Sequence, residues 1–451
     1  MTQNSPPSSL LLRGARAFLP GGPVETDILV KNGLIAGLLS PGAPAAAEDE
    51  IHLKGLTILP GVIDTQVHFR EPGLTHKEDL ESGSRAAVLG GVTAVFEMPN
   101  TNPPTTTPEK ITEKLRLAAG RMHCDHAFYA GASPETIDLI PEVEAMAGVC
   151  GVKMFMGSST GSLLVAEEDQ VRAVLAKSRR RVAVHSEDEE RLKMRKSLAR
   201  PGDWTSHPEV RDAECAWRAT ERLIGWAREA KARVHVLHVT TAEEMAMLAT
   251  AKDVATVETT PQHLTFTAPE IYARLGGFAQ MNPPIRDLRH QQALWDLGIG
   301  QGVVDVIGTD HAPHTRAEKA QSYPASPSGM PGVQTLVAVM LTHVAQGRLS
   351  LARCVDLLAA GPARVFGMVG KGRIALGMDA DFTIVDLDAA RVMTHEQQAT
   401  RCGWTPFDGF EAKGWPIATM LRGAFVMRDG EVTAAGTGQP LRFFETQRAP
   451  R

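Results

Sequence analysis

The stretch that decides the fold reads Val303-Val304-Asp305-Val306-Ile307-Gly308-Thr309-Asp310-His311-Ala312-Pro313-His314. Its first half has the composition of a buried strand, and an aspartate and two histidines follow where that strand would end. Four earlier apolar runs also end in polar residues, at residues 62–70, 152–155, 182–185 and 234–238. We interpret these strand ends as the parts of one metal site.

Strand candidates alternate with helical segments through the middle of the chain. The strands lie near residues 61–68, 92–98, 124–130, 149–156, 181–186, 233–239, 254–260 and 303–309. Thr107-Pro108 and Thr241 mark helix starts, and helical spacing covers residues 210–231, 332–346 and 350–360. Eight such units predict an α/β fold with a (β/α)8 barrel. An open doubly wound sheet is the alternative, but every candidate site residue lies at a C-terminal strand end, and this favours the barrel.

Short strands occupy both ends of the chain. Asn32-Gly33 and Asp429-Gly430 each separate two apolar runs, which is the strongest short-range signal for a β-hairpin. Because so few strands are unstable alone, we expect the two ends to form one small sheet domain together. After Gly361-Pro362 we expect short strands to return.

The composition excludes several classes of partner. The 451 residues are 43% hydrophobic and 22% charged, with a net charge of −5, and the absence of a basic stripe argues against nucleic acid. No apolar run approaches the roughly 20 residues of a membrane helix, and residues 1–9 lack the pattern of a secretory signal. The five cysteines are dispersed, so we expect reduced thiols and a cytoplasmic location.

Five side chains at the strand ends are the candidate metal ligands: His68, Lys153, His185, His238 and Asp310. A catalytic zinc site uses imidazole and carboxylate ligands and keeps one position open for water. A lone histidine at a strand end is more often structural, but four strand ends that carry His or Asp favour a shared ion. His235 precedes the end of its strand, and we assign it to packing or to the surface.

Lys153 lies inside the otherwise apolar run of residues 151–157. An unpaired ammonium is costly to bury, and this leaves two interpretations. Either the lysine pairs with a neighbouring carboxylate, or CO2 converts its amine to a carbamate that can bridge two metal ions.

Seven motifs, in this order, resemble the amidohydrolase superfamily and, within it, the dihydroorotase family. They are residues 64–73 (Asp-Thr-Gln-Val-His-Phe-Arg-Glu-Pro-Gly), 98–101 (Met-Pro-Asn-Thr), 152–161 (Val-Lys-Met-Phe-Met-Gly-Ser-Ser-Thr-Gly), 185–187 (His-Ser-Glu), 238–241 (His-Val-Thr-Thr), 281–286 (Met-Asn-Pro-Pro-Ile-Arg) and 310–314 (Asp-His-Ala-Pro-His). Each motif alone is modest, whereas the ordered set is very specific and covers nearly the whole chain.

The resemblance implies a (β/α)8 amidohydrolase barrel over residues 61–360 and a small composite β-sandwich domain from residues 1–60 and 361–451. It implies one or two Zn2+ ions held by His68, N6-carboxylated Lys153, His185, His238 and Asp310. The reaction it implies is reversible hydrolysis of (S)-dihydroorotate to N-carbamoyl-L-aspartate in de novo pyrimidine biosynthesis, with Asp310 as general base and then general acid. A homodimer is usual for the resemblance, and aspartate transcarbamoylase is a candidate partner.

Arg70 is the strongest indication of the substrate. It follows His68 by two residues, so both side chains would point to one side of an extended segment, and its guanidinium matches a carboxylate bidentately. Dihydroorotate carries such a carboxylate, whereas hydantoins and dihydropyrimidines do not. A salt bridge to Glu71 is the alternative. By resemblance, further substrate contacts come from Asn100 and His314 at the carboxylate and Asn282 at the ring.

Gln66 departs from the His-x-His pattern that most of the superfamily has on the first strand. A glutamine amide is an uncommon zinc ligand because its oxygen is harder and uncharged. Three outcomes follow: a two-metal site in which Gln66 or water fills the position, a one-metal site, or a weak site. Gln262-His263 replaces a His-His pair of many relatives, and we assign His263 no role.

Other interpretations stay open. Allantoinase and dihydropyrimidinase or hydantoinase are alternatives within the cyclic amidohydrolases, and Arg70 argues against the last two. A non-catalytic, dihydroorotase-like scaffold for aspartate transcarbamoylase is an alternative of another class, although it would have no need of the ligands. The loop Gly157–Gly161 is flexible by composition and is interpreted as a lid or, less well, as a phosphate cradle, because it lacks the lysine of a P-loop.

Overall fold

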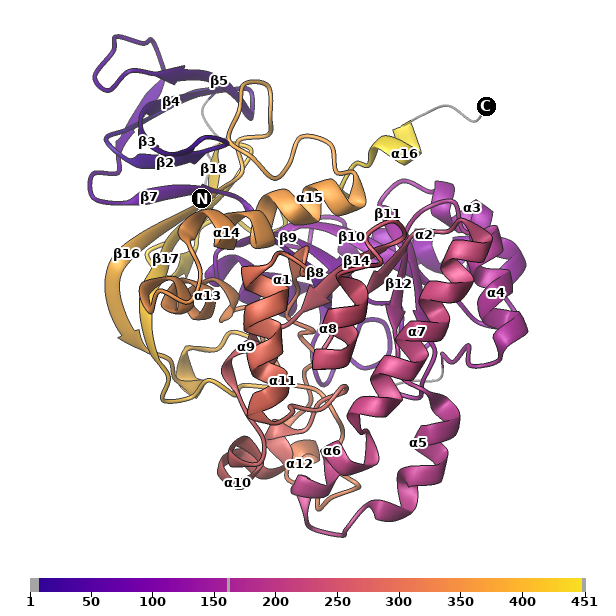
Figure 1. The fold of residues 1–451 in the computed structure, drawn as a ribbon. Helices are drawn as coiled ribbons and strands as arrows, with labels where there is room; N and C mark the ends of the chain where they lie inside the picture. The colour runs from indigo at the N-terminus through magenta and orange to yellow at the C-terminus, as the bar shows by residue number, and fades with distance from the viewer. Residues whose placement is uncertain (1–7, 160–162, 448–451) are drawn as a thin grey trace.

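Eight parallel strands form a barrel in the middle of the chain (Figure 1). The computed structural model describes residues 8–159 and 163–447. The barrel strands are β8 (Val62–Val67), β9 (Val92–Glu97), β10 (Asp125–Gly131), β11 (Val149–Phe155), β12 (Val182–His185), β13 (Val234–Val236), β14 (Ala255–Thr259) and β15 (Val306–Ile307). The ring closes through a parallel bridge between Val67 and His311, where the His68 N–H donates to the His311 carbonyl at 2.7 Å.

All eight strand predictions are confirmed, and the closed ring excludes the open-sheet alternative. Almost every strand residue is buried, because helices cover the outside of the ring and side chains fill the inside. The helices are α1 (Leu80–Leu89), α2 (Pro108–Ala118), α3 (Ile140–Ala145), α4 (Glu168–Lys177), α5 (Glu189–Arg195), α6 (His207–Val210), α7 (Ala213–Ala230), α8 (Ala242–Leu248), α9 (Pro261–Thr265), α10 (Glu270–Leu275), α11 (Leu288–Ala293), α12 (Arg316–Lys319), α13 (Leu336–Ala345), α14 (Leu351–Val355), α15 (Gly361–Phe366) and α16 (Phe444–Gln447). No helix among the described residues has both the length and the apolar content that a membrane crossing requires.

Strands from both chain ends form two further sheets beside the barrel (Figure 1). The four-stranded sheet has the order β5-β4-β1-β6, and the seven-stranded sheet has the order β19-β18-β17-β16-β7-β2-β3. Their bounds are β1 (Ser9–Arg13), β2 (Arg16–Leu19), β3 (Gly22–Glu25), β4 (Asp27–Lys31), β5 (Leu34–Leu39), β6 (Asp49–His52), β7 (Thr57–Pro60), β16 (Phe382–Val392), β17 (Glu411–Leu421), β18 (Ala424–Arg428) and β19 (Glu431–Val432). Side chains of both sheets share one apolar core, so the expected composite sandwich is confirmed.

Both predicted hairpin turns are present. Asn32-Gly33 joins β4 to β5 with φ angles of 49° and 78°, and Asp429-Gly430 joins β18 to β19 with φ angles of 52° and 85°. Positive φ at both central residues is the requirement of a type I′ turn, which glycine and Asn or Asp meet at low cost.

The helix predictions hold with two differences. Thr241 caps α8 by accepting from the Glu244 N–H, whereas Thr107 precedes α2 without a side-chain cap and bonds to Glu109 instead. The chain does not leave helical structure at Gly361-Pro362, because these residues begin α15. Proline is tolerated there since the first helical turn needs no N–H from it.

The C-terminal tail returns to the barrel and covers its floor. The Leu441 N–H donates to the His126 carbonyl at 2.8 Å, and the Phe443 ring packs edge-on against Phe96, with the centroids 5.9 Å apart. Both side chains join an apolar cluster with strand residues such as Ile63. The floor of the barrel is therefore closed, and the chemistry is confined to the opposite face.

Candidate active site

A small chamber at the C-terminal ends of the barrel strands contains nearly all of the predicted site residues. Its lining comprises Gln66, His68, Arg70, Asn100, Lys153, Phe155, Ser159, His185, His238, Asn282, Asp310, Ala312, Ser328 and Gly329. The remaining candidate, His314, lies behind Arg70, with Nε2 at 3.3 Å from Nη2. The free volume is about 20 Å3, which is room for about one water molecule.

Three chamber residues have left-handed backbone conformations. The φ angles are 64° at Arg70, 37° at His238 and 48° at Asp310. Such conformations cost non-glycine residues on the order of 1–3 kcal/mol and concentrate at functional sites. Arg70 therefore does not lie in an extended segment, and the argument that placed it on the side of His68 by strand alternation is wrong. Both side chains nevertheless line the chamber.

His185 and His238 form one side of the chamber. His185 Nδ1 lies 3.1 Å from His238 Nε2, and the opposite nitrogen of His185, Nε2, donates to Glu187 at 2.7 Å. Burial would raise the pKa of Glu187, but Arg211 and His185 outweigh it and hold that pKa well below its ordinary range. The permanent carboxylate keeps the proton of His185 on Nε2, so Nδ1 is unprotonated and can serve as a ligand atom.

His68, Gln66 and Asp310 form the other side. His68 Nε2 lies 3.0 Å from Asp310 Oδ1, and the Gln66 amide donates to the same oxygen at 2.9 Å. His68 Nδ1 lies 2.8 Å from Asn100 Oδ1, which accepts its proton and leaves Nε2 directed at the chamber. Burial lowers the pKa of His68 to about 4. The Gln66 Oε1 atom is buried without a hydrogen-bond partner.

Lys153 is fully buried without an ion-pair partner. Its Nζ atom makes no hydrogen bond and lies 4.3 Å from the centre of the Phe155 ring. Burial lowers the pKa of this amine to about 7, because an ammonium loses its hydration inside the barrel. Pairing with a neighbouring carboxylate, the simpler of the two interpretations, is wrong, because Nζ has no hydrogen-bond partner among the described residues.

The donor atoms of these side chains are of the types that bind a metal ion, but they lie farther apart here than in an assembled metal centre. Among the described residues, no three His, Cys, Asp or Glu side chains are grouped closely enough to hold an ion by themselves. Two pairs of ligand atoms face one chamber, together with an unbonded amine that a carbamate would convert into an anionic ligand. Imidazole, carboxylate and carbamate donors suit a borderline ion such as Zn2+.

Arg70 is buried, and its guanidinium has no acidic partner among the described residues. Nε donates to the Pro313 carbonyl at 3.2 Å, and Glu71 pairs with Arg121 at 2.8 Å instead. The salt bridge expected as the alternative for Arg70 is therefore wrong. Burial lowers the pKa of Arg70 to about 10, against the opposing charges of Asp310, Glu97 and Glu318, so Arg70 carries its charge at neutral pH and can form an ion pair with an anion that enters the chamber.

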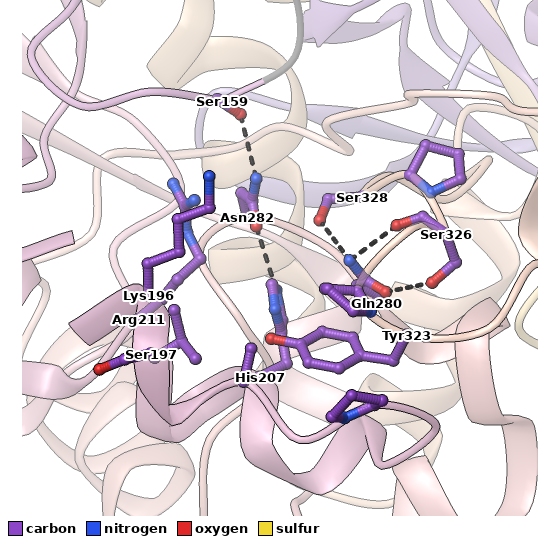
Figure 2. Close-up of a pocket in the computed structure, with 15 residues that line it drawn as sticks. Ser159, Lys196, Ser197, His207, Arg211, Gln280, Asn282, Tyr323, Ser326 and Ser328 are labelled. Atoms are coloured by element: carbon purple, nitrogen blue, oxygen red, sulfur yellow. Dashed lines mark hydrogen bonds between the residues drawn. The ribbon is translucent and has the colours of Figure 1, made fainter. Parts of the chain in front are cut away.

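A larger cavity of about 570 Å3 lies directly outside the chamber (Figure 2). Ser159, Asn282 and Ser328 line both spaces, so the two are continuous. Lys196 and Arg211 also line the outer cavity, whereas no Asp or Glu of the described residues does. The approach to the chamber is therefore cationic.

Sequence reasoning missed several supporting residues. Glu187 belongs to the His-Ser-Glu motif, whose sequence assigns it no role, and Arg211, which donates to Glu187 at 2.5 Å, lies in a loop after α6. Glu258 lies within the barrel, where burial raises its pKa to about 8, and it accepts from Thr65 at 2.5 Å. Of these supporting residues, Glu187 alone has a signal in the sequence, since it follows the candidate ligand His185 by two residues.

The two histidines left outside the site have structural surroundings. His235 is buried, with Nδ1 at 2.8 Å from Thr256 Oγ1 and Nε2 at 3.3 Å from Glu258, so its assignment to packing is confirmed. His263 Nε2 donates to the Pro283 carbonyl at 3.1 Å. In the loop Gly157–Gly161, Thr160 and Gly161 lie outside the described residues, so the lid interpretation stays a prediction.

Comparison with known proteins identifies the family. Residues 57–426 match the model of the amidohydrolase family. The chain belongs to this family. This amidohydrolase is 38% identical to the dihydroorotase of Halobacterium salinarum over 397 residues, which cover 85% of this chain and 89% of that protein. It is 34% identical to the allantoinase of Solibacter usitatus over 453 residues, with 96% and 97% covered.

A solved structure shares the whole architecture. The L-hydantoinase (dihydropyrimidinase) from Arthrobacter aurescens matches with a TM-score of 0.91 at 29% identity, and the match covers 96% of this chain and 99% of that one. The barrel and the composite sandwich are thus those of a cyclic amide hydrolase. Members of the amidohydrolase family generally bind metal, in agreement with the donor atoms of the chamber.

Proposed function

We propose that this amidohydrolase is a zinc-dependent dihydroorotase, which catalyses reversible hydrolysis of (S)-dihydroorotate to N-carbamoyl-L-aspartate in de novo pyrimidine biosynthesis. The single observation that carries the proposal is the buried guanidinium of Arg70, which lines the chamber and forms no ion pair with any described residue. A ring that bears a carboxylate gives this cation a direct ion-pair partner, whereas an uncharged ring does not.

The substrate carboxylate is assigned to Arg70, Asn100 and His314. Arg70 and Asn100 line the chamber, and His314 Nε2 lies 3.3 Å from Arg70 Nη2 and 3.1 Å from the Ser328 carbonyl. Asn282 is assigned to the ring because it lies where the chamber meets the outer cavity. These contacts would orient the ring with its amide bond toward Asp310.

The metal is assigned to His68, carboxylated Lys153, His185, His238 and Asp310. When bound, Zn2+ lowers the pKa of water to about 7 and polarises a carbonyl oxygen. Lys153 supplies a neutral amine for carboxylation, since burial brings its pKa to about 7. His185 presents Nδ1 because Glu187 holds its other nitrogen, and His68 presents Nε2 because Asn100 holds its Nδ1.

Asp310 is assigned the proton transfers. Gln66 and His68 both contact Oδ1, whereas Oδ2 makes no hydrogen bond to any described residue. Oδ2 would take the proton from the attacking water and deliver it to the leaving ring nitrogen, as general base and then general acid. The bond between the carbonyl carbon and the ring nitrogen breaks, so that the carbonyl carbon becomes the new carboxylate and the nitrogen becomes the NH2 group of the carbamoyl unit.

Two other substrates have specific support. The allantoinase of Solibacter usitatus and the L-hydantoinase from Arthrobacter aurescens match this chain over nearly its full length. Neither allantoin nor a hydantoin ring requires a buried arginine for a carboxylate, so Arg70 favours dihydroorotate. A non-catalytic scaffold remains the alternative of another class.

The test is hydrolysis of L-dihydroorotate, allantoin and dihydrouracil by zinc- and bicarbonate-supplemented protein, with metal content measured in parallel. Selective turnover of dihydroorotate is expected. Arg70→Met should raise KM for dihydroorotate far more than for an uncharged ring, and Asp310→Asn should keep zinc while turnover is lost. Turnover of a different ring would overturn the substrate, and absence of both metal and turnover would favour the scaffold.

The assembly and location follow as part of the same proposal. The substrate is a small molecule, the expected state is a homodimer in the cytoplasm, and association with aspartate transcarbamoylase is a further expectation. The five cysteines, all within the described residues, are buried and unpaired, as suits a reducing compartment. Sedimentation of the purified protein, alone and with the transcarbamoylase, tests both associations.

A further inference from the structure

The place where the substrate ring must lie is the junction between the two cavities. The chamber holds about 20 Å3 of free volume, and the outer cavity holds about 570 Å3. The chamber therefore has room for about one water molecule, and a six-membered ring must extend outward to the shared wall of Ser159, Asn282 and Ser328. Asn282 is the shared residue whose amide can either donate or accept.

His207 determines which way this amide faces. Its Nε2 atom lies 3.0 Å from the Met281 carbonyl oxygen and 3.1 Å from Asn282 Oδ1. A carbonyl oxygen only accepts hydrogen bonds, so Nε2 must carry a proton. The Asn282 atom that faces the same N–H must then be an acceptor, which makes it the oxygen. This assignment follows from the neighbouring Met281 carbonyl alone.

The amide nitrogen of Asn282 consequently faces the junction. Nδ2 lies 3.4 Å from Ser159 Oγ, on the opposite side from His207, and Figure 2 shows His207, Asn282 and Ser159 in line across the pocket. The junction thus presents an N–H donor to whatever occupies it. Without a fixed partner behind it, the amide could turn and present its oxygen instead.

His207 is itself held in place. It is the first residue of α6, it is 5% exposed, and its ring packs edge-on against Tyr323 with the centroids 5.8 Å apart. Burial, reinforced by the charge of Arg211, lowers its pKa to about 4. The ring is therefore neutral at physiological pH, with its one proton committed to Nε2.

We propose that His207 is a positioning residue that locks Asn282 with its amide nitrogen toward the substrate, and so selects a ring with a carbonyl oxygen at the junction. The inference rests on the proposed function, in which one ring carbonyl is attacked at the metal. The locked amide then donates to the other carbonyl, that of the urea unit, which the ring and its opened product share. An analogue with a donor or a CH2 group there is rejected.

Three variants test the lock. His207→Leu removes it and should raise KM for dihydroorotate roughly tenfold, the value of a hydrogen bond that is no longer held, with kcat changed less. His207→Gln keeps an N–H donor and should recover most of the loss. Asn282→Asp places an acceptor against the carbonyl and should raise KM roughly a hundredfold. His343→Leu is the matched control, since His343 is equally buried, on α13, and bonds Thr265 at 2.9 Å.

A double variant distinguishes a positioning role of His207 from a role in stability alone. If His207 acts through Asn282, the double variant His207→Leu/Asn282→Ala should be no worse than Asn282→Ala alone. Additive losses, or an equal loss in His343→Leu, would overturn the proposal. Metal content and the unfolding temperature, measured on each variant, identify any loss that comes from misfolding.

The protonation of His207 can be measured without substrate, and so independently of the proposed function. Neutron diffraction, or nitrogen NMR of histidine-labelled protein, reports the ring proton of His207 in the resting protein. A proton on Nε2 is expected, and a proton on Nδ1 overturns the lock even if dihydroorotate is the substrate. If the protein hydrolyses another cyclic amide, the dihydroorotase proposal fails, and the same variants assayed on that ring decide the lock.

Discussion

The two sides of the chamber are built from similar residues but supported differently. On one side, His185 and His238 face each other at 3.1 Å, and Glu187 and Arg211 hold His185 from behind. On the other side, Gln66 stands where most relatives are expected to have a histidine, and its amide nitrogen bonds Asp310 at 2.9 Å. One side thus provides two imidazoles, one of which is held by a buried ion pair, whereas the other side provides a single imidazole.

The comparison teaches that the proposed centre is asymmetric. A buried carboxylate behind a ligand histidine fixes its tautomer and raises its basicity, which strengthens metal binding. Gln66 contributes only an uncharged oxygen, and that atom is buried without a partner. We therefore expect one ion to bind tightly on the His185 side and a second ion to bind more weakly on the Gln66 side, with Lys153 as a ligand of both.

Removal of Lys153, the ligand that both ions would share, should have the largest effect on metal binding and on turnover. Lys153→Ala leaves neither side with a carbamate, so we expect loss of both ions and a fall in kcat/KM of about a thousandfold or more. Metal analysis and kinetics measure it. Lys319→Met, which removes a buried lysine that donates to the Gln280 and Pro327 carbonyls, should keep its metal. Full metal in Lys153→Ala would contradict the assignment.

Acid should weaken the centre through the same lysine. Only a neutral amine reacts with CO2, and a lysine is neutral above its pKa. Because burial lowers the pKa of Lys153 to about 7, carboxylation of the apoprotein should be favourable above pH 7 and fall about tenfold per pH unit below it. Activation by zinc at fixed dissolved CO2, followed from pH 8 to pH 5, measures this. A pH-independent rate would argue against an uncharged lysine.

Loss of the ionic support should weaken the stronger side. Glu187→Gln keeps a hydrogen bond to His185 but removes the charge, so zinc affinity should fall by about 10- to 100-fold. Competition with a chelator measures the affinity. Glu189→Gln is the control, because Glu189 bonds the Ser158 N–H at 2.7 Å and contacts no proposed ligand. Equal effects of both changes would remove the special role of Glu187.

Repair of the weaker side should have the smallest effect on turnover. Gln66→His supplies the missing imidazole, so we expect metal content to rise toward two ions per chain, while kcat/KM changes by only about a few-fold. Gln262→His, a change at a buried glutamine that lies outside the chamber, should leave the metal content unchanged. An unchanged metal content in Gln66→His would show that the two sides do not differ through this residue.

The sequence was sufficient for the barrel and for the residues that gather in the chamber. Parallel strands are buried on both faces and give long apolar runs, and the polar residues at their ends meet because barrel strand ends converge. This argument depends on strand order alone, and it brought His68, Lys153 and Asp310 to one chamber.

The residues that hold the chamber side chains in place could not be predicted from the sequence, because their positions depend on the conformation of loops. Arg211 and His207 lie around α6, with no periodic pattern to aim them at Glu187 or Asn282. The left-handed turn at Arg70 breaks strand alternation for a reason that only the packed site supplies. The tail that brings Phe443 under the barrel has no local signal either, since a single aromatic residue fits many surroundings.

The composite sandwich ties the start of the chain to its end. In the seven-stranded sheet, β7 pairs with β2 on one edge, and on the other edge Ile58 is paired with Ile384 of β16. This second edge has no partner until the ribosome has made the whole barrel. At roughly 5–20 residues per second, this wait lasts on the order of tens of seconds. An open strand edge is a template for aggregation. The nascent chain, rather than the finished enzyme, is therefore the form that most needs chaperones.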